Sequence, residues 1–373
     1  MEQHKQTSIF EYPDITEPIL SGDEPVNATL TKIAASLAAL LISCSAIAGD
    51  DRDDRSERED GDRFSFAMIG DVPYGVAPYS EYPAFDNLVK QVNRQKKLKW
   101  VIHTGDIKSG GTECSDDLFY DRLDRYNAFK KPFIYTPGDN EWTDCHRVNA
   151  GEYQPLERLA KLREVFFSTP GKTIGGKTMS VETQAWSAGY EEFPENVRWS
   201  KNGVIFTALH VVGSNNGLKA FDPASSAVRG DEDDAEAYRR IDAAVEWINE
   251  TFDKAIEEDA PGVLFMMQAN PILEVGYALP RGDALTAARE GFNEILTTLE
   301  RRTLEYAKPV VLAHGDSHYF RVDKPGLVEN GFIGNFTRVE NFGSSRVHWV
   351  KITVNPKSKQ VFKFQPMIIE ENL

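Results

Sequence analysis

The chain has 373 residues, of which 41% are hydrophobic and 27% are charged, and its formal net charge at pH 7 is −16. A charge this negative argues against a nucleic-acid backbone or an anionic membrane surface as a bulk partner. It leaves room for a small phosphorylated substrate, because bound cations can reverse the sign of the local field.

The first 48 residues have the pattern of an export leader. A polar stretch is followed by Lys32, an apolar run, and small residues at Ala46 and Ala48, which is the order of a basic flank, an apolar segment and a cleavage site. The apolar run of roughly 16 residues is short for a membrane span, so an uncleaved anchor is the less favoured alternative. We expect export to the periplasm or cell envelope.

The sequence LISC, which ends at Cys44, also resembles a bacterial lipoprotein box. In that case Cys44 would be a lipidated N-terminus, and membrane contact is expected only through such a signal or lipid anchor. Residues 49–63 form a charged run without apolar residues, which predicts a disordered spacer. The folded domain is therefore expected over residues 64–373.

Two cysteines remain after cleavage near residue 48, namely Cys114 and Cys145. In an exported protein an even number of cysteines predicts a disulfide. Two unpaired buried thiols are the alternative.

From residue 64 onward, β-type and helical patterns alternate, which predicts parallel strands covered by helices in one α/β domain. The strand patterns cover 64–70, 98–105, 132–138, 203–213, 262–269 and 309–315, and the helical patterns cover 82–97, 116–131, 233–258 and 283–306. The closing segment 346–367 alternates around an Asn-Pro turn and predicts an antiparallel hairpin.

Four of these strand patterns end in Gly-Asp, at Asp71, Asp106, Asp139 and Asp316. Ligands of an α/β sheet bind at the carboxyl ends of its strands, so we expect these carboxylates to converge there together with His318. Converging carboxylates repel one another unless cations neutralise them, and divalent ions would also activate water. A strand-end turn or a helix cap is the alternative for any one aspartate taken alone.

The succession of motifs resembles the calcineurin-like metallophosphoesterase family, whose motifs run Asp-x-His, Gly-Asp, Gly-Asn-His-Asp/Glu, His and Gly-His-x-His. Here they read GDVP, HTGD, PGDNE, MQANP and HGDSH. The resemblance implies a sandwich of mixed β-sheets flanked by helices. It also implies that Asp71 and His318 belong to a first metal site, that Asp106 bridges, and that Asp139 and Asp316 belong to a second metal site.

The chain departs from the family pattern at several ligand positions. The replacements are Pro73 for a ligating His, Asp139 for Asn, Asn140 for a His that acts as general acid or orients the substrate, and Asp316 for a His. In MQANP the metal-binding His is absent, and Gln268 is expected to supply an oxygen ligand, with Asn270 as the weaker choice. Because nitrogen ligands are lost and oxygen ligands remain, one or two ions of Mn²⁺, Mg²⁺ or Ca²⁺ are favoured over Zn²⁺ or Fe.

These residues predict an enzyme that hydrolyses a phosphate mono- or diester outside the cytoplasm with metal-activated water. Catalytic roles are expected for Asn140, His318 and His103, and substrate contacts for Asn140, Lys108 and Asn215. A hydrogen-bonded core position is the alternative for His103, surface solvation for Lys108, and a plain turn for Asn215. The alternative function is a metal- or phosphate-binding protein that has kept the scaffold and lost turnover, which Pro73 and Asn140 would explain.

Overall fold

The structure, a computed structural model, describes residues 62–76, 78, 80–271 and 289–373. The expected leader, Cys44, most of the spacer and the start of the helix predicted at 283–306 lie outside the described residues. Within the described ranges, no helix combines the length and apolar character that crossing a membrane would require.

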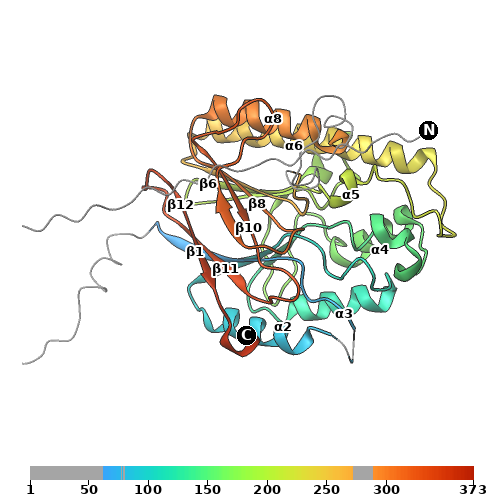
Figure 1. Cartoon of the computed structure of the whole chain (residues 1–373). Coiled ribbons are helices and arrows are strands. Elements are labelled where there is room, and N and C mark those ends of the chain that lie inside the picture. The colour runs from blue at the N-terminus through green and yellow to red at the C-terminus, as the bar shows by residue number, and fades with distance from the viewer. Residues whose placement is uncertain (1–61, 77, 79, 272–288) are drawn as a thin grey trace, which may run out of the picture. The chain divides into compact units, whose positions relative to one another are not determined.

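Two mixed β-sheets form the centre of the fold, with helices on their outer faces (Figure 1). The first sheet has the order β12 (Phe362–Met367), β11 (Trp349–Val354), β1 (Phe64–Ile69), β2 (Leu98–His103) and β3 (Phe133–Tyr135). The second has the order β4 (Glu182–Thr183), β5 (Val197–Lys201), β6 (Val204–Ala208), β7 (Val263–Met266), β8 (Val310–His314), β10 (Phe336–Glu340) and β9 (Arg321–Asp323). The predicted α/β class and mixed-sheet sandwich are confirmed, and so is the closing hairpin, because β11 and β12 pair antiparallel.

The alternation of side chains along β1 explains how the first sheet is buried on both faces. Phe66 and Met68 belong to the apolar cluster shared with the second sheet, whereas Ala67 and Ile69 belong to the cluster under the helices. Successive side chains of a strand point to opposite faces, so the continuous apolar run FSFAMI suits a central strand. Between the sheets, Phe66 stacks on Trp100 at 5.2 Å and meets Phe206 edge-on at 5.6 Å.

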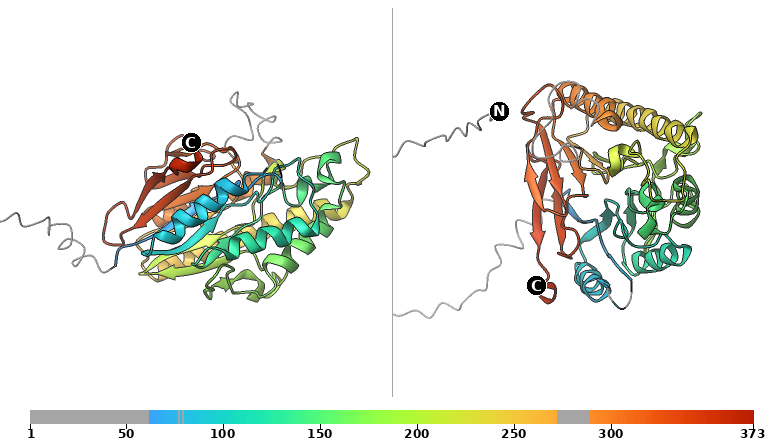
Figure 2. Two further views of the ribbon diagram at one scale, coloured as in Figure 1. Left: turned by 90° about the horizontal axis from the view of Figure 1, so that it is seen from below. Right: turned by 45° about the vertical axis from the view of Figure 1, so that its right-hand side comes forward.

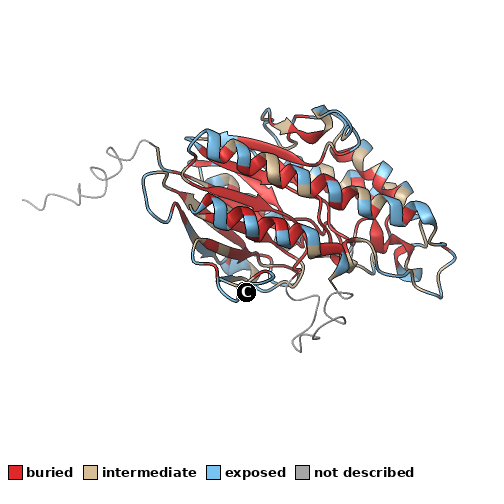
Figure 3. Ribbon diagram, turned by 90° about the horizontal axis from the view of Figure 1, so that it is seen from above, coloured by how far each residue is buried: buried red, intermediate tan, exposed pale blue. Residues whose placement is uncertain are grey.

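Helices α2 (Tyr82–Arg94), α3 (Asp116–Asn127) and α4 (Pro155–Phe166) contribute apolar side chains to the cluster on the outer face of the first sheet (Figure 2). Helices α6 (Asp231–Glu257) and α8 (Glu290–Tyr306) do the same for the second sheet. Each of these two helices carries a buried side and an exposed side (Figure 3), as amphipathic helices on a sheet do. The remaining short helix, α5 (Gly213–Asn216), follows β6.

The start of α3 follows from its sequence. The Ser115 hydroxyl accepts a hydrogen bond from the backbone N–H of Leu118, and Asp116 and Asp117 lie in the first turn. A serine cap and early acidic residues both stabilise the positive end of a helix. This cap fixes the end of the loop that leaves β2, which carries Asp106.

The sequence interpretation is wrong in some boundaries. The strand predicted over 203–213 ends at Ala208, and the next residues form a loop that leads into α5. Helix α4 and the strands β4, β5, β9 and β10 were not predicted. Most of these strands are short, and their burial patterns lack a long alternating run.

The loops that carry the Gly-Asp motifs follow the carboxyl ends of parallel strands in each sheet. Strands β1, β2 and β3 are parallel neighbours in the first sheet, and β6, β7 and β8 are parallel neighbours in the second. The backbone N–H of Asp71 donates to the carbonyl of Gly105 at 2.9 Å, which joins the loops after β1 and β2. A disulfide between Cys114 and Cys145 joins the loop after β2 to the segment after β3, which confirms the expected pairing.

Gly105 permits the close approach of the two sheets at this edge. Its φ is +97°, and a Cβ there would lie 2.7 Å from the Cβ of Gln268 and 2.9 Å from the backbone nitrogen of Gly138. We predict that Gly105→Ala lowers the free energy of unfolding by about 1–2 kcal/mol for the left-handed backbone. The close contacts of the added methyl group should lower the free energy of unfolding by about 1–3 kcal/mol more.

Gly189→Ala is the matched control, because Gly189 has a φ of +85° but no atom within 4 Å of the added Cβ. Urea unfolding of both variants separates the cost of the left-handed backbone, which both share, from the cost of overpacking, which is expected only at Gly105. Equal losses in the two variants would contradict the close approach at Gly105.

Candidate metal centre

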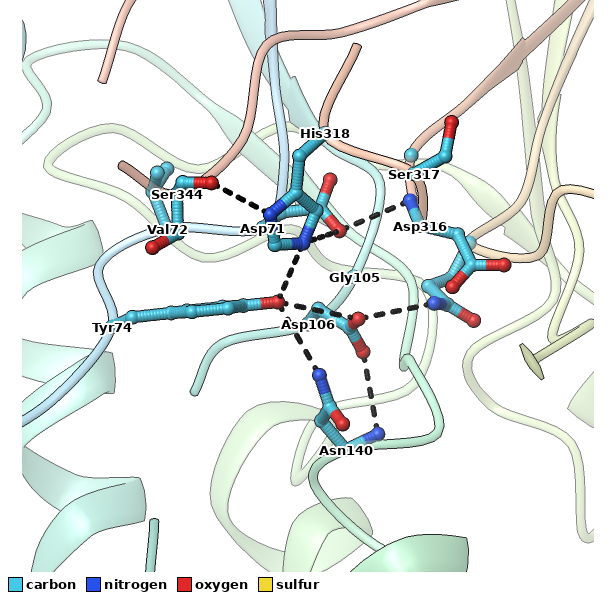
Figure 4. Close-up of polar contacts among 12 residues, drawn as sticks. Asp71, Val72, Tyr74, Gly105, Asp106, Asn140, Asp316, Ser317, His318 and Ser344 are labelled. Atoms are coloured by element: carbon cyan, nitrogen blue, oxygen red, sulfur yellow. Dashed lines mark hydrogen bonds and ion pairs between the residues drawn. The ribbon is translucent and has the colours of Figure 1, made fainter. Parts of the chain in front are cut away.

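The structure brings the four predicted aspartates together, although they lie far apart in the sequence. Asp106, Asp139 and Asp316 each offer a carboxylate oxygen, and these three oxygens lie within 4.8 Å of one another. Asp71 is linked to them because its Oδ1 accepts a hydrogen bond from the backbone N–H of Asp316 at 3.0 Å. The His318 Nε2 lies 3.4 Å from the same Asp71 oxygen (Figure 4).

Burial and mutual repulsion make this cluster electrically unfavourable as a set of bare anions. Burial raises the pKa of Asp106 well above its usual range, and the negative charges of Asp139 and Glu141 raise it further. Burial also raises the pKa of Asp71, although the hydrogen bond from Asn341 acts in the opposite direction. The pKa of Asp316 rises to about 7 through burial and the charge of Asp139. Such a cluster is stabilised by a cation.

The chemistry of the cluster fits a hard divalent cation at one position. Asp106, Asp139 and Asp316 provide three oxygens and no nitrogen or sulfur, and oxygen donors suit Mg²⁺, Mn²⁺ and Ca²⁺. The Ser214 hydroxyl contacts Asp139 Oδ2 and Asp144 Oδ1, both at 2.9 Å. Asp139 is therefore held in place by α5.

Gln268 differs from the expected oxygen ligand. Its Nε2 donates to Asp106 Oδ2 and to Asp139 Oδ1, each at 3.2 Å, whereas its Oε1 accepts from the backbone N–H of Gly213 at 2.6 Å. An amide N–H group has no lone pair for a cation. As placed, Gln268 is a hydrogen-bond donor that orients two carboxylates, because the backbone of Gly213 occupies its oxygen.

Asn140 lies where the sequence placed it, beside the cluster. Its backbone N–H donates to Asp106 Oδ1 at 3.3 Å, and its Nδ2 donates to the Tyr74 hydroxyl, also at 3.3 Å. The Tyr74 hydroxyl in turn lies 3.4 Å from Asp106 Oδ2 and 3.2 Å from His318 Nε2 (Figure 4). The sequence did not predict that Tyr74 contacts the candidate metal ligands. Its position just after the first Gly-Asp motif was the only feature that could have indicated this contact.

Glu141 holds the loops that carry Asp106 and Asp139, and it was also missed. Its Oε1 accepts from the backbone N–H groups of Gly138 at 2.6 Å and Asp106 at 3.1 Å, and from the Tyr135 hydroxyl at 2.7 Å. Its Oε2 accepts from the backbone N–H of Ile107 at 3.3 Å. The acidic residue two positions after Asp139 was visible in PGDNE as part of the family motif, without an assigned role.

Two of the predicted site residues point away from the carboxylates. His103 is fully buried, with Nε2 contacting the Val72 carbonyl at 2.8 Å and the Tyr126 hydroxyl at 3.1 Å. Asn215 turns toward α8, where its Oδ1 accepts from the backbone N–H of Gly291 at 3.1 Å. These contacts favour the core and turn alternatives, and we do not retain either residue in the proposed catalytic or substrate-binding set.

Lys108 lies near the cluster but does not reach the surface. Its side chain is buried, and Nζ donates to the Ser109 carbonyl at 3.0 Å. Burial lowers the pKa of Lys108 to about 8, while the charges of Glu141 and Asp106 act in the opposite direction. Its ammonium group therefore serves better as a fixed positive charge behind the carboxylates than as a direct substrate contact.

A separate groove of about 1280 Å³ opens at the other end of β8. Val310, the first residue of that strand, lines it together with Lys308 and Lys363. Asp316 follows the last residue of the same strand, and none of the clustered aspartates lines the groove. We therefore place no part of the candidate site there.

The fold and the cluster together define a class of protein, namely a two-sheet α/β sandwich with a carboxylate cluster that could hold a divalent cation at the ends of its strands. The chain belongs to the calcineurin-like phosphoesterase family, which matches residues 64–320. The resemblance inferred from the motifs is thus confirmed.

One solved structure, titled "Structure of PhoD", is similar to this chain with a TM-score of 0.46 and 12% sequence identity. The match covers 80% of this chain but 65% of the solved one, which is less than two thirds of its length, and a likeness this distant carries no argument. A comparison with curated proteins found no match.

We predict that Glu141→Gln destabilises the fold and the centre together. The new amide would turn N–H groups toward buried donors, which costs about 2–4 kcal/mol of unfolding free energy. Mn²⁺ affinity should fall about 10- to 100-fold, as for other residues that orient ligands. Urea unfolding and Mn²⁺ titration check this, with the exposed Glu371→Gln as control, and an unchanged Mn²⁺ affinity would refute the positioning role.

The raised pKa values of Asp71, Asp106 and Asp316 predict how stability depends on pH. After treatment with a chelator, the folded chain binds protons on these groups more tightly than the unfolded chain does. The contribution of these groups to stability is therefore fully present below the ordinary carboxyl pKa of about 4 and is lost as pH rises through their raised pKa values, which for Asp316 is about 7.

Cations compete with protons for the same oxygens, so the increase in Tm caused by Mn²⁺ should be larger at pH 8 than at pH 5. Asp316→Asn should reduce this difference. Asp259→Asn should not, because Asp259 has a similar left-handed backbone but is exposed elsewhere. A larger increase at pH 5 would contradict the assignment.

Proposed function

We propose that this chain hydrolyses a phosphate mono- or diester in a reaction that depends on a divalent cation. The observation that supports it best is the convergence of Asp106, Asp139 and Asp316 oxygens within 4.8 Å, in a member of the calcineurin-like phosphoesterase family. The acidic surface charge is compatible with a small phosphorylated substrate that is bound at this centre.

Asp106, Asp139 and Asp316 are the residues that would hold the cation. When bound there, a divalent cation supplies Lewis-acid polarisation of a phosphoryl oxygen and of an attacking water. The carboxylates fix the charge of the site, and Gln268 and Ser214 orient two of them through the hydrogen bonds described above. Glu141 joins the loops that carry Asp106 and Asp139, because its carboxylate accepts hydrogen bonds from the backbone of both.

Asn140 is proposed to orient a phosphoryl oxygen by donating a hydrogen bond from Nδ2. Its backbone N–H is fixed on Asp106, so the side chain is anchored at the edge of the cluster. An amide N–H is far too weak an acid to protonate a departing alkoxide, so Asn140 cannot act as a general acid. Substrates whose leaving groups depart without protonation, such as aryl esters, are therefore favoured.

His318 is the imidazole that contacts the cluster. Its Nδ1 lies 2.7 Å from the Ser344 carbonyl, which only accepts, so Nδ1 carries a proton and Nε2 faces Tyr74 and Asp71. We propose that His318, held in this tautomer, orients the Tyr74 hydroxyl during the reaction.

Location outside the cytoplasm is part of the proposal. The leader pattern in the first 48 residues and the disulfide between Cys114 and Cys145 support it, because structural disulfides persist in oxidising compartments.

A second candidate function is metal or phosphate binding without turnover. Two observations favour it, namely Pro73 at a ligand position and Asn140 at the position of a general acid. One experiment separates the two functions. The purified chain is assayed on aryl phosphate mono- and diesters with Mg²⁺, Mn²⁺ and Ca²⁺, and binding of the same ions is measured in parallel.

We predict cation-dependent turnover that falls more than about 100-fold in Asp106→Asn, a loss beyond that expected for residues that only orient ligands. Asp259→Asn, another aspartate with a left-handed backbone, should keep full activity. Ion binding without turnover on any ester would reject the enzyme and support the binding protein.

A further inference from the structure

We propose that the Tyr74 hydroxyl takes the place of one of the family's two cations, so that this chain binds a single divalent cation at Asp106, Asp139 and Asp316. The inference rests on the proposed function, because it concerns the same centre. It specifies which of the two sites implied by the resemblance still fits a cation and which does not.

The first site lacks a ligand and has its carboxylate already engaged. The side chain of Pro73 has no donor atom for a metal. Asp71 Oδ1 accepts from the backbone N–H of Asp316 at 3.0 Å, and its Oδ2 accepts from Asn341 Nδ2 at 2.8 Å. Asn341 is itself held by the hydroxyl of Thr104 at 2.5 Å. Both oxygens of Asp71 are thus stabilised by protein donors.

The nitrogen of the first site is engaged as well. Because Nδ1 of His318 donates to the Ser344 carbonyl, the lone pair of the neutral ring is on Nε2. The Tyr74 hydroxyl lies 3.2 Å from Nε2 and is the neighbouring group that can donate to it. The ring nitrogen that would bind a cation therefore faces a phenol hydroxyl at hydrogen-bond distance.

Tyr74 occupies the space between the ligands of the first site. Its hydroxyl oxygen contacts both His318 Nε2 and Asp106 Oδ2, at 3.2 and 3.4 Å. The two atoms that a cation of the first site would need therefore both contact this hydroxyl instead. Figure 4 shows the ring reaching toward His318 and Asp106 from the loop after β1.

The ring is held there by several contacts. It packs edge-on against the His318 imidazole, with 5.3 Å between ring centroids. The backbone N–H of Tyr74 donates to Glu81 Oε2 at 2.8 Å, and Glu81 Oε1 accepts from the Ser344 hydroxyl at 2.6 Å. Ser344 also supplies the carbonyl that fixes His318. Tyr74 and His318 therefore share one support at Ser344, which holds the hydroxyl beside the imidazole.

The second site keeps all three of its carboxylates. The oxygens of Asp106, Asp139 and Asp316 lie within 4.8 Å of one another. Each carboxylate also accepts hydrogen bonds from the protein, given by Gln268, Ser214 and the backbone N–H groups of Asn140 and Asn270. The Asn341 amide donates to Asp71, and the single proton of the Tyr74 hydroxyl is available to either His318 Nε2 or Asp106 Oδ2, where a second cation would otherwise supply charge.

The test is the number of ions bound by the full chain, which does not depend on activity. Equilibrium dialysis with Mn²⁺ should give one ion per chain, and electron paramagnetic resonance should show an isolated Mn²⁺ ion. Asp316→Asn should abolish this binding, whereas His318→Gln should retain it. The unmodified chain and these two variants together decide how many ions bind and at which site, even if the variant described next does not fold.

The variant Pro73→His/Tyr74→Ala restores the missing ligand and removes the phenol. It should bind a second Mn²⁺ and give the signal of a spin-coupled pair, whereas Tyr120→Ala, a matched change at an exposed tyrosine on α3, should still bind one.

A spin-coupled pair in the unmodified chain would overturn the inference and leave the proposed function intact. An ion that persists in Asp316→Asn and is lost in His318→Gln would also overturn it. No bound ion would reject the proposed function together with this inference. One bound ion without turnover would reject the proposed function alone.

Discussion

Electrostatic repulsion among buried carboxylates is the constraint on which the rest of this structure depends. Asp71, Asp106, Asp139 and Asp316 meet where strands of two sheets end, and water is largely excluded there. Each pair of like charges in such a place is costly, and only donors or cations offset the cost. The hydrogen bonds that the surrounding loops donate to these carboxylates offset part of this repulsion.

That compensation comes from different donors in the two halves of the cluster. On the side of Asp71, the Asn341 amide and the Asp316 backbone N–H donate to a single carboxylate. On the side of Asp139, three carboxylates face one another and share the donors Gln268, Ser214 and the backbone N–H of Asn270. The gathering of carboxylates on that side agrees with a chain that has aspartates at positions where the family has other ligands.

The sequence predicted the fold class, the closing hairpin and the meeting of the four aspartates. It could do so because apolar β-runs, Gly-Asp endings and parallel order depend on local pattern and on general rules of sheet topology. It did not predict the direction of the Gln268 amide, which the backbone N–H of Gly213 decides, nor the reach of the Tyr74 phenol to His318. These depend on contacts between residues far apart in the chain, which no local pattern encodes. His103 shows the converse, since a histidine before a Gly-Asp motif pointed to the site while its ring faces α3.

The left-handed backbone of Asp71, Asp106 and Asp316, with φ of 54°, 56° and 80°, has an evolutionary consequence. Asparagine adopts this conformation about as readily as aspartate, so a single amide replacement keeps the turn and removes a repelling charge. Such replacements would reduce the charge repulsion in the fold and would also remove the carboxylates that the proposed cation needs. The same substitutions would therefore raise stability and abolish the proposed reaction, so that only selection for that reaction would keep the aspartates.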